Sequence, residues 1–153
     1  MKQKQYETLL AQLQGLIAGE TNPTSVLANA SALMRDVMGD RFFWVGFYLV
    51  EGDKLVLGPF QGSVACYRIG HGRGVCGTAW AQARSQVVPD VDQFPGHIAC
   101  SSLSRSEIVV PLIDATGTVR GVLDIDSKEL AQFDDVDRQG LERAAALIAS
   151  TLW

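Results

Sequence analysis

The sequence predicts an α+β domain in which a central antiparallel sheet carries its terminal helices on one face. Apolar residues recur at helical spacing at both ends of the chain, and strand-like segments joined by short turns lie between them. The chain has 153 residues and a hydrophobic fraction of 47%. That is enough for one domain over residues 1–153 to bury a substantial core.

The first two predicted elements are amphipathic helices. Residues 5–17 repeat apolar side chains every three or four positions. Asn22 and Pro23 are typical of the N-cap and first residue of a second helix, which Gly39 ends. Each helix therefore presents an apolar stripe to a core.

The predicted sheet has about six strands. Segments rich in β-branched and aromatic residues lie at 42–50, 55–60, 65–69, 85–91, 106–114 and 117–127. Short turns join the first two and the last two of these segments, so each pair forms a hairpin.

Three further segments complete the chain. The glycine-rich stretch 70–77 is predicted to be a loop, followed by a short helix over 78–84. Residues 92–106 are long, polar and irregular, which is typical of a functional loop. Asp134 and Asp135 are suited to cap a final amphipathic helix.

Charge and hydropathy limit the function classes. The net charge is −4 and no basic run exists, so nucleic acid and anionic membranes are poor partners. The longest apolar run, 42–50, is too short to span a bilayer. The N-terminus lacks the apolar core of a signal peptide, and we expect a soluble cytoplasmic protein.

A glycine motif in the middle third resembles a dinucleotide fingerprint. Gly72 to Gly77 matches G-x-G-x-x-G, and Asp92 follows at the expected distance. Pro89 interrupts the next strand, and hairpins rather than βαβ units follow. We therefore reject dinucleotide binding and interpret the glycines as a tight turn.

The three cysteines offer a second candidate site. Cys66, Cys76 and Cys100 could hold zinc with His71 or His97, but their spacing matches no common zinc motif. The sequence thus predicts no metal site, and both histidines are interpreted as solvated or hydrogen-bonded. An odd cysteine count without a signal peptide also argues against a structural disulfide framework.

Acidic residues mark the last strand. Asp124 and Asp126 share one face, and they point to water if the opposite face is the only core. Val122 shares their face, however, and Glu107 opens the neighbouring strand, so three acids could cluster. Clustered carboxylates need a cation, a metal ion or a retained proton, which indicates an ammonium ligand or a proton donor.

Two other features have open interpretations. Trp44 and Tyr48 share a face of their strand, either as aromatic core or as a box around a methyl group or cation. Cys100 lies among serines beside Arg105, in a loop of non-core composition, and is a candidate reactive thiol.

Together these segments resemble the free methionine-(R)-sulfoxide reductases, which are single GAF-type domains. The matching words are "WVGFY" (44–48), "LGPFQGSVACYRI" (57–69), "GRGVCGTAW" (72–80), "VVPDVDQFPGHIAC" (87–100), "SEIVVPL" (106–112) and "GVLDIDS" (121–127). The chain departs from the family pattern at Ser101, where an acidic residue usually stands, and at Leu103.

The resemblance implies roles for the thiols and a reaction. Cys100 would be the nucleophile, Cys66 the resolving thiol and Cys76 a secondary thiol. Cys100 would attack the sulfoxide sulfur and become a sulfenic acid, and Cys66 would then form a disulfide with it. Thioredoxin would reduce the disulfide, so no bound cofactor is expected.

The resemblance also implies a substrate site and an assembly. Glu107, Asp124 and Asp126 would bind and protonate the substrate, and Trp44 and Tyr48 would surround its S-methyl group. A homodimer and a role in oxidative stress are expected by family likeness. The alternative hypothesis is a GAF module that senses a small molecule without catalysis.

Overall fold

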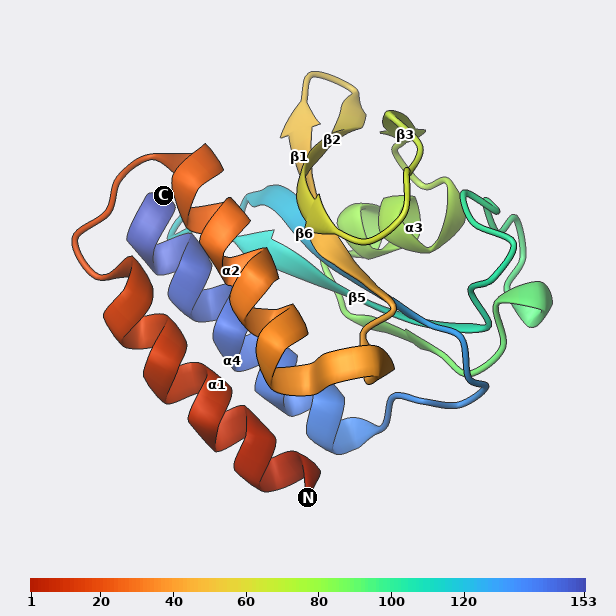
Figure 1. Cartoon of the computed structure of the whole chain (residues 1–153). Helices are drawn as coiled ribbons and strands as arrows, with labels where there is room; N and C mark the ends of the chain where they lie inside the picture. Colours follow the sequence, from red (N-terminus) through yellow and green to blue (C-terminus); the bar gives the residue numbers. More distant parts are fainter.

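The computed structural model describes residues 1–153 and contains one six-stranded sheet (Figure 1). The strands are β1 (Trp44–Glu51), β2 (Lys54–Gln61), β3 (Arg68–Gly70), β4 (Gln86–Val88), β5 (Ser106–Ile113) and β6 (Val119–Ser127). Their order is β3-β2-β1-β6-β5-β4, and every neighbouring pair is antiparallel. The predicted antiparallel sheet is confirmed.

Four α-helices cover the sheet. They are α1 (Lys2–Ile17), α2 (Pro23–Met38), α3 (Gly74–Gln82) and α4 (Asp135–Leu152). In Figure 1, α1, α2 and α4 form a layer on one face, whereas α3 lies on the other. The prediction that the N- and C-terminal helices share one face is therefore confirmed.

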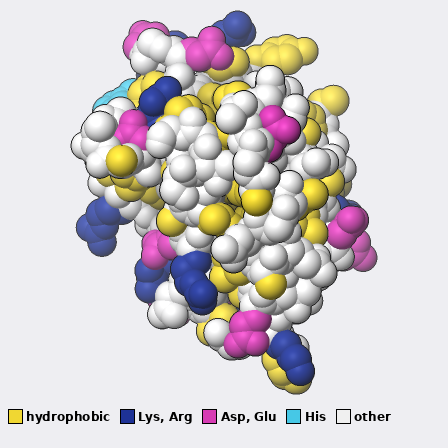
Figure 2. Space-filling model, turned by 90° about the vertical axis from the view of Figure 1, so that its left-hand side faces the viewer, with side chains coloured by type: hydrophobic (Ala, Val, Ile, Leu, Met, Phe, Trp, Pro, Cys, Tyr) yellow, Lys and Arg dark blue, Asp and Glu magenta, His cyan; other side chains and the backbone are white.

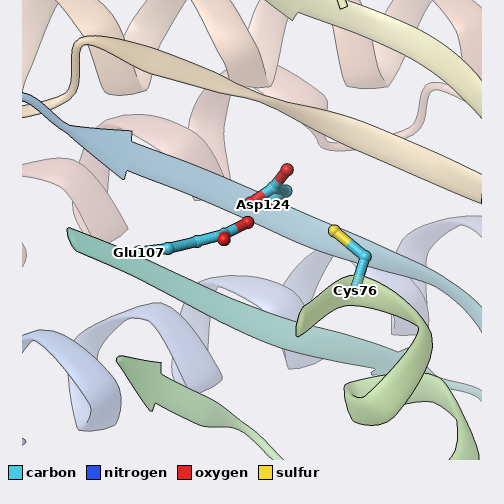
Figure 3. A group of neighbouring side chains, drawn as sticks. All are labelled: Cys76, Glu107 and Asp124. Atoms are coloured by element: carbon cyan, nitrogen blue, oxygen red, sulfur yellow. The ribbon is translucent and has the colours of Figure 1, made fainter. Parts of the chain in front are cut away.

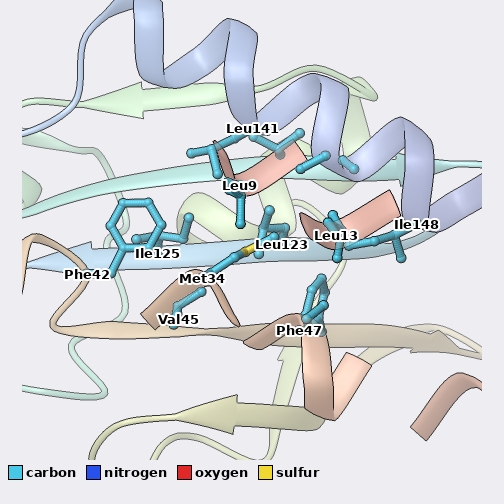
Figure 4. Close-up of a cluster of buried hydrophobic side chains, with 14 of the residues drawn as sticks. Leu9, Leu13, Met34, Phe42, Val45, Phe47, Leu123, Ile125, Leu141 and Ile148 are labelled. Atoms are coloured by element: carbon cyan, nitrogen blue, oxygen red, sulfur yellow. The ribbon is translucent and has the colours of Figure 1, made fainter. Parts of the chain in front are cut away.

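Alternation along the strands divides the buried side chains into two cores. The larger core lies between the sheet and the layer of α1, α2 and α4, and it includes Leu123 and Ile125 of β6 (Figure 4). Val122, which has the opposite orientation, belongs to a smaller core on the side of α3. Both faces of the central strands are therefore buried.

The predicted helix caps form as expected. The Asn22 side chain accepts a hydrogen bond from the backbone N–H of Ser25, and Pro23 begins α2. Gly39 ends this helix with a φ of 63°, a conformation that favours glycine. Asp134 accepts from the backbone N–H groups of Val136 and Asp137 at the start of α4.

The prediction of a loop over 70–77 is wrong at its second half, since α3 begins at Gly74. The reason is a close tertiary approach at Gly77. A Cβ atom there would lie 2.4 Å from the carbonyl oxygen of Gly70, so only glycine lets this turn of helix pack on the preceding segment. Cys76 consequently lies in the first turn of a helix.

Two predicted strands are shorter than expected. The segment at 65–69 is extended and paired only from Arg68 to Gly70, so Cys66 precedes the strand. The segment at 85–91 pairs only over Gln86–Val88, because Pro89 has no N–H to donate to the sheet.

The helical face carries charges of both signs. Figure 2 shows Lys and Arg side chains interspersed with Asp and Glu on this face, with scattered hydrophobic side chains between them. None of the helices combines the length and apolar character that crossing a membrane requires.

Candidate active site

A row of polar and aromatic residues crosses the centre of the sheet on the side of α3. Asp126 of β6 lies directly between Glu107 of β5 and Trp44 of β1. Asp124 lies opposite Gly46 in the same sheet. The predicted cluster of three acids is thus formed by the register of the two central strand pairs.

The acids are buried, which excludes the alternative in which Asp124 and Asp126 point to water. Glu107 and Asp124 are each 6% exposed, and Asp126 is partly buried. Burial raises the pKa of Glu107 well above its usual range, and the negative charges of Asp124 and Asp126 raise it further. Burial likewise raises the pKa of Asp126 and of Asp124. Protons are therefore retained in this cluster at pH values where exposed carboxyl groups are ionised.

Two aromatic rings form the wall beside the acids. Trp44 and Tyr48 are 3% and 2% exposed, and their rings stack with centroids 6.1 Å apart. The Trp44 ring also stacks on Phe60, and its Nε1 donates to the carbonyl of Ser63. Both rings belong to the smaller core, as one sequence interpretation has it, and both also line a cavity. The aromatic box around a methyl group or cation stays a prediction.

Gly46 lets the Trp44 ring take this position. A Cβ atom on Gly46 would lie 2.9 Å from the Trp44 ring and 2.3 Å from the Cβ of Phe60. Gly46 lies between Trp44 and Tyr48 on the same face of β1, and its lack of a side chain leaves room for the indole ring of Trp44.

The loop between β4 and β5 closes over the row. Cys100 in this loop forms a disulfide with Cys66, with their Cα atoms 5.5 Å apart. Its neighbour Ile98 packs on Gly74, where a Cβ atom would lie 3.1 Å from the Ile98 side chain. Two contacts therefore fix the loop against the body of the domain.

Of the two interpretations of His97, solvated or hydrogen-bonded, the structure excludes the first. Its Nε2 lies 3.8 Å from Oε1 of Glu107, and its side chain is only 15% exposed. The sequence could have indicated this position, because His97 lies only three residues before Cys100. A loop that places Cys100 over the site also brings the residues next to it close to the site.

Cys76 faces the acids from helix α3, which packs on the sheet. The thiol is 4% exposed, and the three side chains of Cys76, Glu107 and Asp124 point toward one another from α3, β5 and β6 (Figure 3). Burial raises the pKa of the Cys76 thiol, and the negative charges of Asp124 and Glu107 raise it further. The thiol is therefore protonated at neutral pH and remains free of the disulfide.

These groups enclose a cavity of about 40 Å³. Its lining includes Trp44, Tyr48, Cys76, His97, Cys100 and Glu107. One wall is aromatic, another acidic, and the loop that contains Cys100 covers the cavity. The chemistry of this lining suits a small molecule with an apolar part and a cationic part. A cavity of this size admits such a molecule only when the loop over it moves outward.

Comparison with known proteins identifies relatives over almost the full length. The GAF domain family matches residues 20–152. Free methionine-R-sulfoxide reductase of Escherichia coli is 50% identical over 147 residues, covering 96% of this chain and 88% of that protein. The Saccharomyces cerevisiae protein of the same name is 44% identical over 153 residues, covering 96% of this chain and 85% of that protein.

Solved structures agree with this assignment. The X-ray structure of free methionine-R-sulfoxide reductase from Neisseria meningitidis in complex with its substrate has 52% sequence identity and a TM-score of 0.93. The match covers 97% of this chain and 89% of that one. The resemblance noted in the sequence is confirmed: the chain belongs to the GAF domain family and, within it, to the free methionine-R-sulfoxide reductases.

Proposed function

We propose that the protein reduces free methionine-R-sulfoxide to methionine, using Cys100 as nucleophile and Cys66 as resolving thiol. The observation that carries this proposal is the placement of Cys100 within a lid that covers buried, proton-retaining carboxyl groups. Relatives with 44–52% identity bear the name of this activity, which supports the same conclusion.

The first step of the proposed reaction is attack on sulfur. The Cys100 thiolate attacks the sulfoxide sulfur, and the sulfoxide oxygen needs a proton as its bond to that sulfur breaks. Glu107 or a neighbouring acid supplies the proton, because burial and the adjacent carboxylates raise the pKa of Glu107 and favour its protonated form. The hydroxyl group then passes from the methionine sulfur to Sγ of Cys100, as the bond between the two sulfurs breaks and its electron pair stays on the methionine sulfur. Methionine leaves, and Cys100 becomes a sulfenic acid that holds the former sulfoxide oxygen.

The second step regenerates the thiols. Cys66 attacks the sulfenic sulfur, forming the Cys66–Cys100 disulfide and releasing water. The bond between these two residues, whose Cα atoms lie 5.5 Å apart, supports this step. A dithiol protein such as thioredoxin then reduces the disulfide by exchange, so no bound cofactor is required.

The acids also explain why the substrate would be the free amino acid. A carboxylate within the row attracts an α-ammonium group, which a methionine inside a peptide lacks. Asp124 and Asp126 would hold this group, while Trp44 and Tyr48 contact the S-methyl end. The ammonium also offsets the negative charge that would otherwise raise the pKa of the attacking thiol.

Turnover with matched substrates tests this function. Free methionine-R-sulfoxide with a dithiol reductant should yield methionine, whereas N-acetyl-methionine-R-sulfoxide and the free S epimer should not be reduced to their thioethers. If none of the substrates is reduced, the alternative of a non-catalytic sensing module is favoured. Equal rates with the acetylated compound would contradict ammonium recognition.

Assembly and location belong to the same proposal. We infer a homodimer, which light scattering of the purified protein tests directly. A cytoplasmic location fits the need for a thioredoxin-type reductant, and fractionation of expressing cells tests it.

A further inference from the structure

We propose that Cys76, Glu107 and Asp124 form a binding site for a thiophilic divalent cation such as Zn²⁺, and that the bound ion excludes the substrate. The reaction proposed above makes no use of the Cys76 thiol. Binding of the ion stands on the geometry alone, whereas the inhibition rests on the proposed function.

The first observation is the convergence of three donor atoms. The Cys76 Sγ and one carboxylate oxygen from each acid all lie within 4.8 Å of one another. They come from α3, β5 and β6, and Figure 3 shows the side chains pointing toward a common centre. Donors around a tetrahedral zinc ion lie about 3.3–3.7 Å apart, so small side-chain rotations complete the site.

The second observation is an unpartnered buried oxygen. The Oδ1 atom of Asp124 is buried without a hydrogen-bond partner, in a residue that is 6% exposed. A buried acceptor left unpaired is costly, and a cation beside it removes that cost. The adjoining cavity of about 40 Å³ has room for a water molecule as the fourth ligand.

The donor set selects the kind of ion. Thiolate together with carboxylates suits Zn²⁺, Co²⁺ and Cd²⁺, whereas Mg²⁺ and Ca²⁺ prefer oxygen donors alone. This site differs from the zinc site rejected in the sequence analysis, which combined all three cysteines with a histidine. The disulfide between Cys66 and Cys100 leaves Cys76 as the sulfur ligand.

Binding of the ion releases protons. The Cys76 S–H proton must leave for solvent as the sulfur–metal bond forms, together with any proton held between Glu107 and Asp124. Because the metal binds the thiolate and displaces its proton, affinity should rise with pH. The other charged or titratable groups that line or border this centre are His97, Arg73, Asp126 and Tyr48.

Cobalt spectroscopy on the disulfide form tests the site without any turnover. In this form Cys76 carries the only free thiol, so a sulfur-to-cobalt charge-transfer band reports Cys76 alone. Chelator-treated protein titrated with Co²⁺ should show this band together with tetrahedral visible bands, and Zn²⁺ should abolish both. A protein without the band would overturn the site.

Matched variants sharpen this measurement. Cys76→Ser should lose the charge-transfer band, and Glu107→Gln, which keeps the thiol, should weaken Co²⁺ affinity at least tenfold. His71→Ala removes an exposed imidazole outside the cluster and should leave the spectrum unchanged. A band that persists in Cys76→Ser, or unchanged affinity in Glu107→Gln, would contradict the assignment.

Inhibition is measured separately on the reduced enzyme. Zn²⁺ should raise the apparent KM of the wild type, and the inhibiting concentration should increase at least tenfold in Cys76→Ser, each protein being compared with its own metal-free rate. If Zn²⁺ inhibits the wild type and Cys76→Ser equally, the ion acts at Cys66 and Cys100. That result would overturn the inhibitory role of the proposed site. Absence of turnover without metal would instead contradict the proposed function and leave the cobalt result standing.

Discussion

Glu107 and Asp126 lie directly opposite each other on β5 and β6, so two carboxyl groups share one cross-strand position on a covered sheet face. Like charges at such a position destabilise a sheet, unless a proton or a cation lies between them. The arrangement that would supply the proposed proton donor therefore weakens the fold as these carboxyl groups ionise, and changing the pH measures this effect.

Glu107→Gln should stabilise the protein at neutral and alkaline pH. The folded-state pKa of Glu107 lies well above the ordinary 4.5, so the folded state binds more protons than the unfolded state between these two values. Stability from this group is present at low pH and is lost as pH rises through that window, by at most about 1.4 kcal/mol per pH unit for one proton. Glutamine does not titrate and removes this slope.

Urea unfolding at about pH 5 and about pH 8 measures the effect. The wild type should lose more stability between the two than Glu107→Gln does, whereas Glu129→Gln at an exposed position should behave like the wild type. The expected accompanying result is loss of turnover in Glu107→Gln alone. A variant with the wild-type slope would show that Glu107 is ionised in the folded state.

The two redox cysteines should differ in single-turnover experiments. Cys100→Ser removes the attacking thiolate, so it should form no methionine even when the enzyme exceeds the substrate. Cys66→Ser should form about one equivalent and then recycle poorly with thioredoxin, because its sulfenic acid has no resolving partner. Rapid quench with quantification of methionine distinguishes them, and equal loss in both variants would contradict the assigned roles.

Reduction of the disulfide should lower thermal stability. The bond joins residues 34 positions apart. A disulfide that closes a loop of this size stabilises a fold by about 2–4 kcal/mol, because it lowers the conformational entropy of the unfolded chain. For a chain of this length, that corresponds to a Tm decrease of roughly 5–15 °C when dithiothreitol is added. Cys66→Ser should show no response to the reductant, and a response there would trace the effect to another group.

Much of the site follows from sequence because strand alternation and hairpin register are local. Alternation placed Asp124 and Asp126 on one face and Leu123 on the other, and the hairpin brought Glu107 alongside them. The hydrophobic Val122 on the acidic face correctly indicated that this face also is covered.

Other features depend on contacts between distant segments. Cys76 reaches the acids because α3 starts early, and that start requires the approach of Gly77 to the carbonyl of Gly70. His97 faces Glu107 because its loop is tied down through Cys100. Neither the helix start nor the loop position is encoded in the periodicity of its own segment.

Asp137→Ala should be among the most destabilising substitutions in the chain. Its carboxylate is fully buried and accepts hydrogen bonds from the Tyr6 hydroxyl and the Lys2 Nζ, each at 2.6 Å. It also accepts from the backbone N–H of Asp134, and Arg41 lies 3.4 Å away. Loss of one partner from a buried charge network costs about 3–5 kcal/mol.

The matched control is the nearby Asp135→Ala. Asp135 pairs with Arg138, but its side chain is 67% exposed, so water screens the pair and its loss should change stability little. Denaturant unfolding of both variants makes the comparison. Similar losses in the two variants would show that the buried network adds nothing beyond an ordinary surface ion pair.

Two glycine-to-alanine substitutions in helices should have opposite effects. Gly15 in α1 has no atom within 4 Å of the position that a Cβ would occupy, so alanine there should gain about 0.5–1 kcal/mol from helix propensity. Gly140 in α4 differs, because a Cβ atom would lie 2.4 Å from the Tyr6 ring. The ring cannot swing aside without breaking the bond from its hydroxyl to Asp137. Gly140→Ala should therefore lose about 1–3 kcal/mol despite its better propensity, and equal changes in urea midpoint would refute this contact between α1 and α4.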